Sequence, residues 1–128
     1  MRFMCTQKPN IQPVTWKEAK PQLVAALADY VEAAGVEIAS GQAFPFKIGE
    51  AYTLFRAEGS EFVVVGYQGE HTLKDNAHCI VEIAKRVGAK TIRVHTQRRG
   101  ELRFLNQLGL NFYLHEKRPD EFVLKCRV

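Results

Sequence analysis

Residues 66–75, GYQGEHTLKD, have the composition of a tight turn between a buried strand and a helix. The run EFVVV precedes them, and apolar residues recur at helical spacing after them. The first turn of a helix carries unpaired backbone N–H groups and the positive end of the helix dipole, so the segment is a candidate anion site. Glycine suits such a turn because it lets the backbone approach a ligand closely. Only Gly66 and Gly69 are present, so the spacing alone is a weak signal.

The histidines and cysteines predict no metal site. None of the four histidines has H-E-x-x-H or H-x-x-x-H spacing, and His71 and His78 are about two helical turns apart. Cys5, Cys79 and Cys126 form no C-x-x-C pair, so we expect buried or half-buried thiols in a reducing compartment. Cys79 follows His78 directly, which leaves a nucleophilic pair open, although adjacent helix residues point in different directions.

The composition predicts one soluble globular domain over residues 1–128, with 46% apolar and 25% charged residues. No apolar run approaches the roughly 20 residues that a membrane helix needs, so we expect no membrane partner. The N-terminal segment MRFMCTQKPN lacks the apolar stretch of a signal peptide, and we therefore expect a cytoplasmic protein.

Basic residues are concentrated in one part of this chain, whose net charge is +4. Residues 85–103 contain seven basic residues and one acid, whereas residues 22–61 contain six acids and two basic residues. Such a region suits a polyanion, either nucleic acid or a phosphorylated cofactor, and the alternative is a solvated face that binds nothing. Arg98 and Arg99, at the start of a predicted helix, favour a nearby anion because that helix end is already positive. No zinc-finger, RRM or KH signature supports nucleic acid specifically.

Hydrophobic periodicity predicts a first helix over 16–34. Thr15 and Glu18 form a capping box, Pro21 offers a later start because it lacks an N–H, and Gly35 predicts the end. Residues 39–50, with two glycines and a proline, are predicted to form a loop. Strands follow over 51–57 and 61–67 and form a hairpin, and the second is apolar on both faces, which indicates burial between two layers.

The rest of the chain alternates helices and strands. A helix over 73–87 has Thr72 as its candidate N-cap and carries an apolar stripe. The stripe consists of Leu73, Ala77, Ile80, Ala84 and Val87. A strand over 91–96, a helix over 98–108 and a hairpin of 110–116 with 121–128 complete the order. This order predicts an α/β (α+β) fold, a mixed sheet with helices on both faces.

From Glu61 to Val128 the layout resembles the GCN5-related N-acetyltransferase (GNAT) superfamily, whose members bind acetyl-CoA on a strand–turn–helix with the motif Q/R-x-x-G-x-G/A. When the helix end 84–88 is set on the family's A-x-x-x-G, Gln68 is the first motif residue, and His71 and Leu73 occupy the two glycine positions. Residues 98–110, RRGELRFLNQLGL, are similar to the family's N-x-x-A-x-x-L-Y-x-K-x-G-F, and residues 11–27 are similar to its first strand and helix.

The resemblance implies a GNAT-like acyl-CoA N-acyltransferase fold, a mixed twisted sheet flanked by about three helices, and acetyl-CoA-dependent N-acetyltransferase activity. The implied partners are a CoA thioester and an amine acceptor, and the implied cofactor crevice lies where the strand 61–67 parts from the strand 91–96. The implied cofactor-binding residues are Gln68, Gly69, Glu70, His71, Thr72, Leu73 and Arg98. Backbone amides of residues 70–73 would hold the pyrophosphate, because backbone donors do not depend on side-chain identity.

The sequence departs from the family at the catalytic positions. The usual general acid, a tyrosine on the last helix, corresponds to Leu105, which cannot donate a proton, and the motif's asparagine corresponds to Arg98. Tyr67, at the end of the buried strand, is a candidate replacement acid. Glu61 is a candidate base for the amine, which must lose a proton before it attacks. The alternatives are a half-buried tyrosine with its hydroxyl at the surface and a solvated carboxylate.

The run 101–128 also resembles the C-terminal part of short acetyltransferase-like proteins of tailed phages, some of which are packaged in the virion. Those proteins have a reduced or absent CoA motif. The alternative function is therefore a non-catalytic GNAT-like protein of phage or prophage origin, whose basic C-terminal half binds a protein or nucleic-acid partner. The sequence leaves both functions open.

Overall fold

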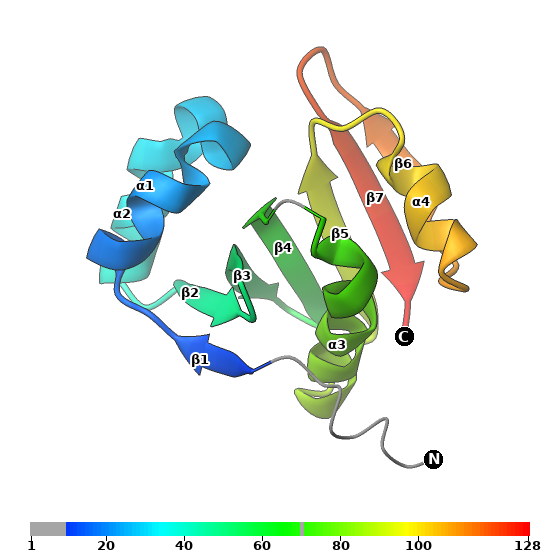
Figure 1. Cartoon of the computed structure of the whole chain (residues 1–128), viewed down its shortest axis with the longest axis horizontal. Coiled ribbons are helices and arrows are strands. Elements are labelled where there is room, and N and C mark those ends of the chain that lie inside the picture. The colour runs from blue at the N-terminus through cyan, green and yellow to red at the C-terminus, as the bar shows by residue number, and fades with distance from the viewer. Residues whose placement is uncertain (1–9, 70) are drawn as a thin grey trace.

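One seven-stranded sheet with helices on both faces forms the body of the protein (Figure 1). The structure is a computed structural model and describes residues 10–69 and 71–128. The strands lie in the order β1-β2-β3-β4-β5-β7-β6. Their bounds are β1 Ile11–Pro13, β2 Ala43–Ile48, β3 Ala51–Glu58, β4 Glu61–Gln68, β5 Thr91–Thr96, β6 Tyr113–Lys117 and β7 Phe122–Arg127. β4 and β5 pair in parallel and all other neighbours pair antiparallel, which confirms the predicted mixed sheet.

The predicted helix over 16–34 is broken into two. α1 (Trp16–Leu27) ends where Ala28 takes a φ of 53°, and a 3₁₀ turn, η2 (Ala28–Tyr30), leads into α2 (Val31–Ala39). The predicted stop at Gly35 is wrong, because α2 continues through it. A Cβ at position 35 would lie 3.1 Å from the indole Nε1 of Trp16, so this glycine permits close packing of α2 on α1.

The start of α1 confirms the Thr15 cap, whose hydroxyl accepts from the backbone N–H of Glu18 (3.2 Å). The Glu18 carboxylate accepts a hydrogen bond from the Tyr52 hydroxyl on β3 (3.0 Å). Pro21 lies inside α1, so the helix begins at Trp16 rather than at the proline.

The segment 39–50, predicted as a loop, contains β2, and that prediction is wrong. β2 pairs with β3 along its whole length, whereas β1 pairs only with the part from Phe46 to Ile48. Pro45 therefore lies just beyond the ladder to β1, where its missing N–H costs little, and its carbonyl accepts from the N–H of Val14 (3.2 Å). The two glycines and the proline of this segment predict a loop, and they obscured the pattern of the short strand between them.

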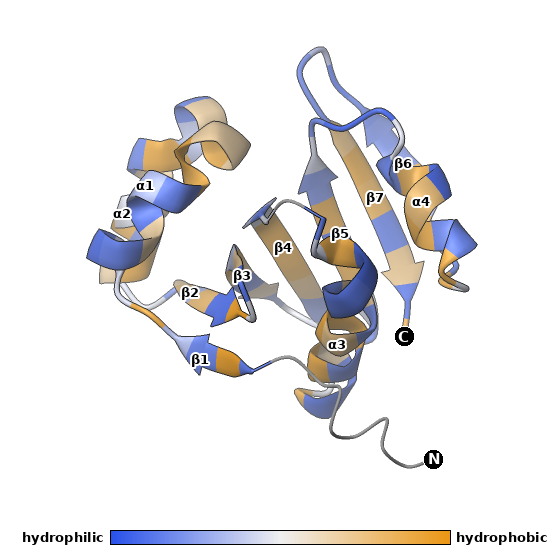
Figure 2. Cartoon of the chain, viewed as in Figure 1, coloured by the Kyte–Doolittle hydropathy of each residue, from blue (hydrophilic) through white to orange (hydrophobic). Residues whose placement is uncertain are grey.

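Two separate cores hold the helices on the two sheet faces. On one face α1 packs against β3 and β4 and α2 packs against β2, and this core is Ala19, Leu23, Leu27, Ala34, Ala43, Leu54, Val63 and Val65. On the other face α3 (Leu73–Arg86) and α4 (Glu101–Gln107) pack over a second core that includes Phe62, Val64, Ile80, Ile92 and Leu105. β4 supplies buried residues to both cores, so the prediction that it lies between layers is confirmed (Figure 2).

α3 and α4 are both shorter than predicted. Val87, assigned to the apolar stripe of α3, lies past the end of the helix and is 65% exposed. Arg98 and Arg99 precede α4, and Glu101 occupies its first turn. The sequence placed the two arginines at the start of this helix, and that prediction is wrong, because both precede it. In the described part of the chain no helix is long and apolar enough to span a membrane.

β4 and β5 part from each other halfway along, and we call this opening the strand gap. The parallel pairing runs from Glu61 with Thr91 to Val64 with Val94 and then stops, while β4 continues to Gln68. At the same point a bulge interrupts the pairing of β4 with β3, because Leu54 pairs with Gly66 and Phe55 with Val64. A bulge bends its strand, which gives a physical reason for the divergence. The predicted parting of these strands is confirmed.

Candidate functional site

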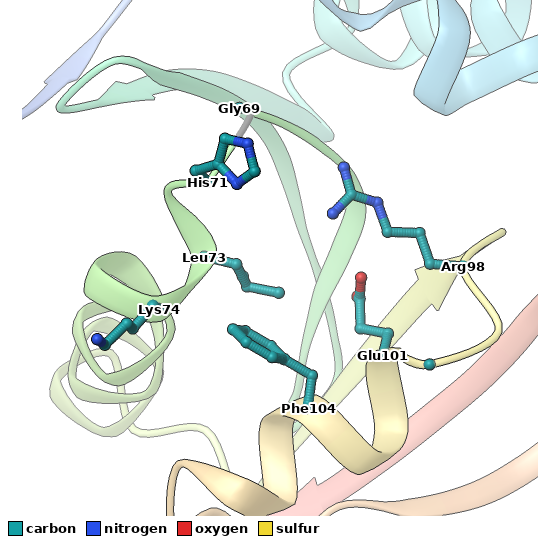
Figure 3. A pocket seen from close by; sticks show the side chains of 8 residues that line it. Gly69, His71, Leu73, Lys74, Arg98, Glu101 and Phe104 are labelled. Carbon is teal, nitrogen blue, oxygen red and sulfur yellow. The ribbon is translucent and has the colours of Figure 1, made fainter.

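A pocket of about 460 Å³ lies between the first turns of α3 and α4, and we call it the α3–α4 pocket. It is lined by Gly69, His71, Leu73, Lys74, Arg98, Gly100, Glu101 and Phe104. Leu73 and Phe104 point toward each other across it from the two helices (Figure 3). The pocket thus combines an apolar pair with groups of both charges, and its volume is that of an ordinary small-molecule site.

The turn into α3 is held by a buried hydrogen-bond network. Asn76, 2% exposed, donates through Nδ2 to the Ile48 carbonyl (3.2 Å) and to the Tyr67 hydroxyl (2.9 Å). The Thr72 hydroxyl donates to the Gly69 carbonyl (2.8 Å), so Tyr67 directs its own proton at Thr72 Oγ1 (2.6 Å). Thr72 is the N-cap residue of α3, as predicted, but its side chain bonds backward along the turn and makes no cap bond to the helix.

The Tyr67 hydroxyl lies between the turn and a small apolar cavity of about 30 Å³, which Glu101 and Leu105 also line. Burial raises the pKa of this hydroxyl, while the hydrogen bonds with Thr72 and Asn76 act to lower it. Leu105 is 4% exposed and belongs to the core. The position at which the resemblance places a tyrosine acid therefore holds a packing residue.

Two residues fix the shape of the turn itself. A Cβ at Gly69 would lie 2.5 Å from both the Ala51 Cβ and the Thr72 Oγ1, so only glycine fits there. His71 has a φ of 59°, in the left-handed region that costs other residues about 1 kcal/mol and glycine little. The backbone at 71 is therefore the conformation that a glycine would adopt freely, although the sequence supplies a histidine.

Glu101 is the site residue that the sequence interpretation missed. It lines both the α3–α4 pocket and the small cavity, and Figure 3 shows its carboxyl beside Leu73 and Arg98. Burial raises the pKa of this carboxyl, against the lowering effects of a hydrogen bond with Thr96 and of the Arg98 charge. The available signal was its position as the single acid among the basic residues 85–103.

Glu61 lies at the opposite end of β4 from the α3–α4 pocket. Its carboxylate contacts Arg93 Nη1 (2.8 Å) and Lys125 Nζ (3.1 Å) and accepts from the Thr91 hydroxyl (2.9 Å). Burial acts to raise the pKa of Glu61, but the bonds from Lys125 and Thr91 and the nearby positive charges bring it below its ordinary value. The structure therefore does not bring Glu61 together with the other predicted site residues.

A second hollow, of about 1040 Å³, lies on the other face of the sheet between α1 and the β6–β7 hairpin, and we call it the α1-face cleft. Val65 and His95 both line it, and each directly follows the last paired residue of its strand at the strand gap. His95 Nδ1 lies 3.0 Å from Glu121 Oε2, and its Nε2 accepts from Arg93 Nε (3.1 Å). Because a carboxylate only accepts, the proton of the neutral ring is on Nδ1.

Four of the seven predicted cofactor-binding residues line the α3–α4 pocket, namely Gly69, His71, Leu73 and Arg98. Gln68 pairs with Tyr52 at the end of β4, and Thr72 belongs to the network of the turn. Glu70 lies outside the described residues.

Over residues 10–69 and 71–128, no three His, Cys, Asp or Glu side chains are grouped so that they could hold a metal ion. Cys79 is half-buried and Cys126 is buried, as expected, and Cys5 lies outside the described residues.

The fold described above is similar to that of solved acetyltransferases of the GNAT family. An acetyltransferase from Bacillus subtilis in complex with CoA matches 94% of this chain and 99% of its own, with a TM-score of 0.71 at 14% identity. A GNAT family acetyltransferase from Elizabethkingia anophelis with acetyl-CoA bound matches over the same shares, with a TM-score of 0.71 at 10% identity. The chain therefore has the GNAT fold, as the resemblance implied.

A third similar structure is the PaiA N-acetyltransferase from Thermoplasma acidophilum in complex with coenzyme A, with a TM-score of 0.58 and 11% identity over 94% of this chain and 99% of that one. No protein-family model matches the sequence, and neither does any curated protein.

Proposed function

We propose that the protein is an acetyl-CoA-dependent N-acetyltransferase that holds CoA in the α3–α4 pocket and admits an amine acceptor through the α1-face cleft. The observation that carries this proposal is the strand gap, which opens between a pocket on one sheet face and a cleft on the other. Reactants bound on opposite faces would meet only there, and such juxtaposition supplies a large part of the rate in a two-substrate reaction.

The residues of the α3–α4 pocket fit CoA. The basic side chains of Lys74 and Arg98 suit its phosphates, and the first amides of α3 add donors that need no particular side chain. Leu73 and Phe104 offer apolar surface to a long flexible arm. Gly69 has no side chain and lies close to Ala51 and Thr72, so the turn stays narrow and a phosphate can approach its backbone closely. When bound, acetyl-CoA supplies an acetyl group whose thioester carbonyl carbon is open to attack by an amine.

The acceptor amine must lose a proton before it attacks. His95, held by Glu121, lines the cleft next to the strand gap, and we assign it the removal of that proton through Nε2, which must first release the N–H of Arg93. Tyr67 stays the candidate general acid, with its proton directed at Thr72. The ion pairs of Glu61 favour a structural role over the predicted role as base.

Isothermal titration with acetyl-CoA, with CoA for comparison, tests the cofactor site. We expect a micromolar dissociation constant, roughly −8 kcal/mol. Arg98→Ala should weaken binding, whereas Arg127→Ala, on the distant end of β7, should leave it unchanged. Absence of heat and of any thermal stabilisation at millimolar ligand would refute the proposal. If acetyl-CoA binds, a screen of primary amines with thiol release as the readout identifies the acceptor.

A second candidate is a non-catalytic protein that uses its basic surface for a protein or nucleic-acid partner, as the likeness to phage proteins suggests. The observation that favours it is the burial of Leu105 where an acid is expected, together with the exposure of Arg99 and Arg103 outside the pocket. Changing Arg98, Arg99 and Arg103 together to Ala should then abolish capture of the partner without loss of the fold. Capture that survives the triple change would remove this candidate.

A further inference from the structure

Of the described residues that line the α3–α4 pocket, Glu101 is the one that carries a carboxyl. Its partners come from different elements: Arg98 and Thr96 precede α4, and Tyr67 lies at the end of β4. His71 and Lys74, at the start of α3, line the same pocket. A carboxylate at this place is unexpected for a site that binds phosphates, because an ionised Glu101 repels a polyanion.

We infer that Glu101 couples CoA binding to proton uptake, so that the pocket binds CoA tightly when the Glu101 carboxyl is neutral and weakly when it is ionised. This inference rests on the proposed function, because it takes the α3–α4 pocket as the CoA site. It adds a residue that sets the affinity of that site and a dependence of the affinity on pH.

The first physical reason is the competition for Arg98. Arg98 lies near Glu101 and partly offsets its charge, and among the described residues Arg98 forms no ion pair within 4.0 Å. A bound phosphate that takes the Arg98 guanidinium leaves Glu101 without its counter-charge and adds negative charge beside it. Both changes favour the neutral carboxyl.

The second reason is the environment of the carboxyl before any ligand arrives. Glu101 packs beside Leu73 and Leu105 and lines the apolar cavity, and burial already raises its pKa above the ordinary value. The effect of burial and the expected effect of a bound phosphate therefore act in the same direction. Glu82 on α3 is exposed and does not line the pocket, so it serves as a control for the loss of one negative charge.

The sign of the linkage follows from these shifts. Below the pKa of Glu101 in the free protein the affinity for CoA is highest and independent of this group. Between the free and the bound pKa values the affinity falls as pH rises, by about tenfold for each pH unit. Above the bound value it is constant again. Glu101→Gln holds the pocket in its neutral form, so this variant should bind more tightly than the wild type at neutral pH.

The test is isothermal titration of the full chain with acetyl-CoA over a pH series, and at one pH in two buffers that differ in ionisation enthalpy. We expect net proton uptake by the wild type and by Glu82→Gln, and a smaller uptake by Glu101→Gln together with roughly tenfold tighter binding, the effect of one pKa unit. His71, Lys74 and the phosphates of CoA are present in all three titrations, so a difference between the proteins belongs to Glu101. Glu101→Ala removes the carboxyl without introducing the side-chain amide of glutamine. Provided that its melting temperature is unchanged, this variant repeats the test.

Equal affinity and equal proton uptake in the wild type and Glu101→Gln would overturn the inference and leave the CoA site standing. Weaker binding by Glu101→Gln would also overturn it, because the ionised carboxylate would then be a favourable contact. If no protein of the series binds acetyl-CoA at any pH, the proposed function itself fails.

Discussion

The two sides of the strand gap differ in how their charges are used. On the α1 side the charged groups form a continuous chain of contacts, which runs through Tyr30, Glu37, Arg56, Glu58, Arg93, Glu61 and Lys125. A branch from Arg93 passes through His95 to Glu121 and Arg118. On the α3–α4 side, within the described residues, neither Lys74 nor Arg98 forms an ion pair.

The paired charges on the α1 side hold that surface in shape, whereas the basic groups on the α3–α4 side are available to a ligand. Charges that are already paired hold a surface in one shape and have little attraction left for a ligand, whereas unpaired basic groups attract an anion. The basic run 85–103 therefore overstates the charge available to a polyanion, because Arg93 points to the α1 side and is neutralised by Glu58 and Glu61. Arg98, Arg99 and Arg103 remain exposed on the other side.

The largest expected effect is from Gly69→Val, which attacks the α3–α4 side at its turn. The new Cβ would overlap the Ala51 Cβ and the Thr72 Oγ1, each 2.5 Å away, and it would lie 2.9 Å from the Ala51 backbone. We expect a loss of about 3 kcal/mol in the free energy of unfolding and no measurable acetyl-CoA binding. Urea denaturation and calorimetry measure both.

Gly100→Ala is the matched control for Gly69→Val. Gly100 lines the same pocket, its φ is −89°, and an added Cβ would meet nothing within 4 Å. This variant should keep its stability within about 0.5 kcal/mol. If both glycine variants behave alike, the turn is not the rigid element described above.

Asn76→Ala tests the network that fixes the same turn. The change leaves the Ile48 carbonyl and the Tyr67 hydroxyl without a buried donor, so we expect a loss of about 2 kcal/mol in the free energy of unfolding. Tyr67→Phe removes only the hydroxyl and should cost about 1 kcal/mol. A fall in turnover of about a hundredfold in Tyr67→Phe, at unchanged acetyl-CoA affinity, would instead support its role as general acid.

Glu61→Gln tests the α1 side. The depressed pKa of Glu61 means that its contribution to stability is present above its ordinary value of 4.5 and is lost as pH falls through the lower folded value. The variant should lose roughly 1–2 kcal/mol at pH 7, a value between those of exposed and buried ion pairs. Its stability should also fall less steeply in acid than that of the wild type, as followed by urea denaturation at several pH values.

The control for Glu61→Gln is Glu116→Gln. Glu116 pairs with Arg118 at 2.9 Å, but both side chains are close to half exposed, so its removal should change the stability at pH 7 very little. Acetyl-CoA binding should survive both changes if Glu61 is structural. A selective loss of turnover in Glu61→Gln, without loss of stability, would restore it as a catalytic base.

The sequence predicted the parts of the fold that depend on repetition and missed those that depend on contacts. The apolar runs of β4 and the stripe of α3 report burial directly, and the predicted parting of β4 from β5 follows from the family layout. Gly35 and Pro45 led to wrong predictions because the reason for each lies in tertiary contacts. Gly35 packs against Trp16 within a helix, and Pro45 lies next to the end of the pairing between β1 and β2. Glu101 was missed because only the folded chain brings it beside Leu73.

The smallest expected effect is from His71→Gly, which sharpens the description of the α3–α4 side as a turn shaped for glycine. Glycine adopts the φ of 59° at this position without steric cost, but it also gains freedom in the unfolded chain. The net result should be a gain of about 0.5–1 kcal/mol in the free energy of unfolding. His78→Gly, at an exposed position inside α3, should have the opposite sign and lose about 1 kcal/mol. Destabilisation by both changes would mean that contacts of the His71 side chain outweigh its backbone strain, and that the histidine is part of the site by more than its position.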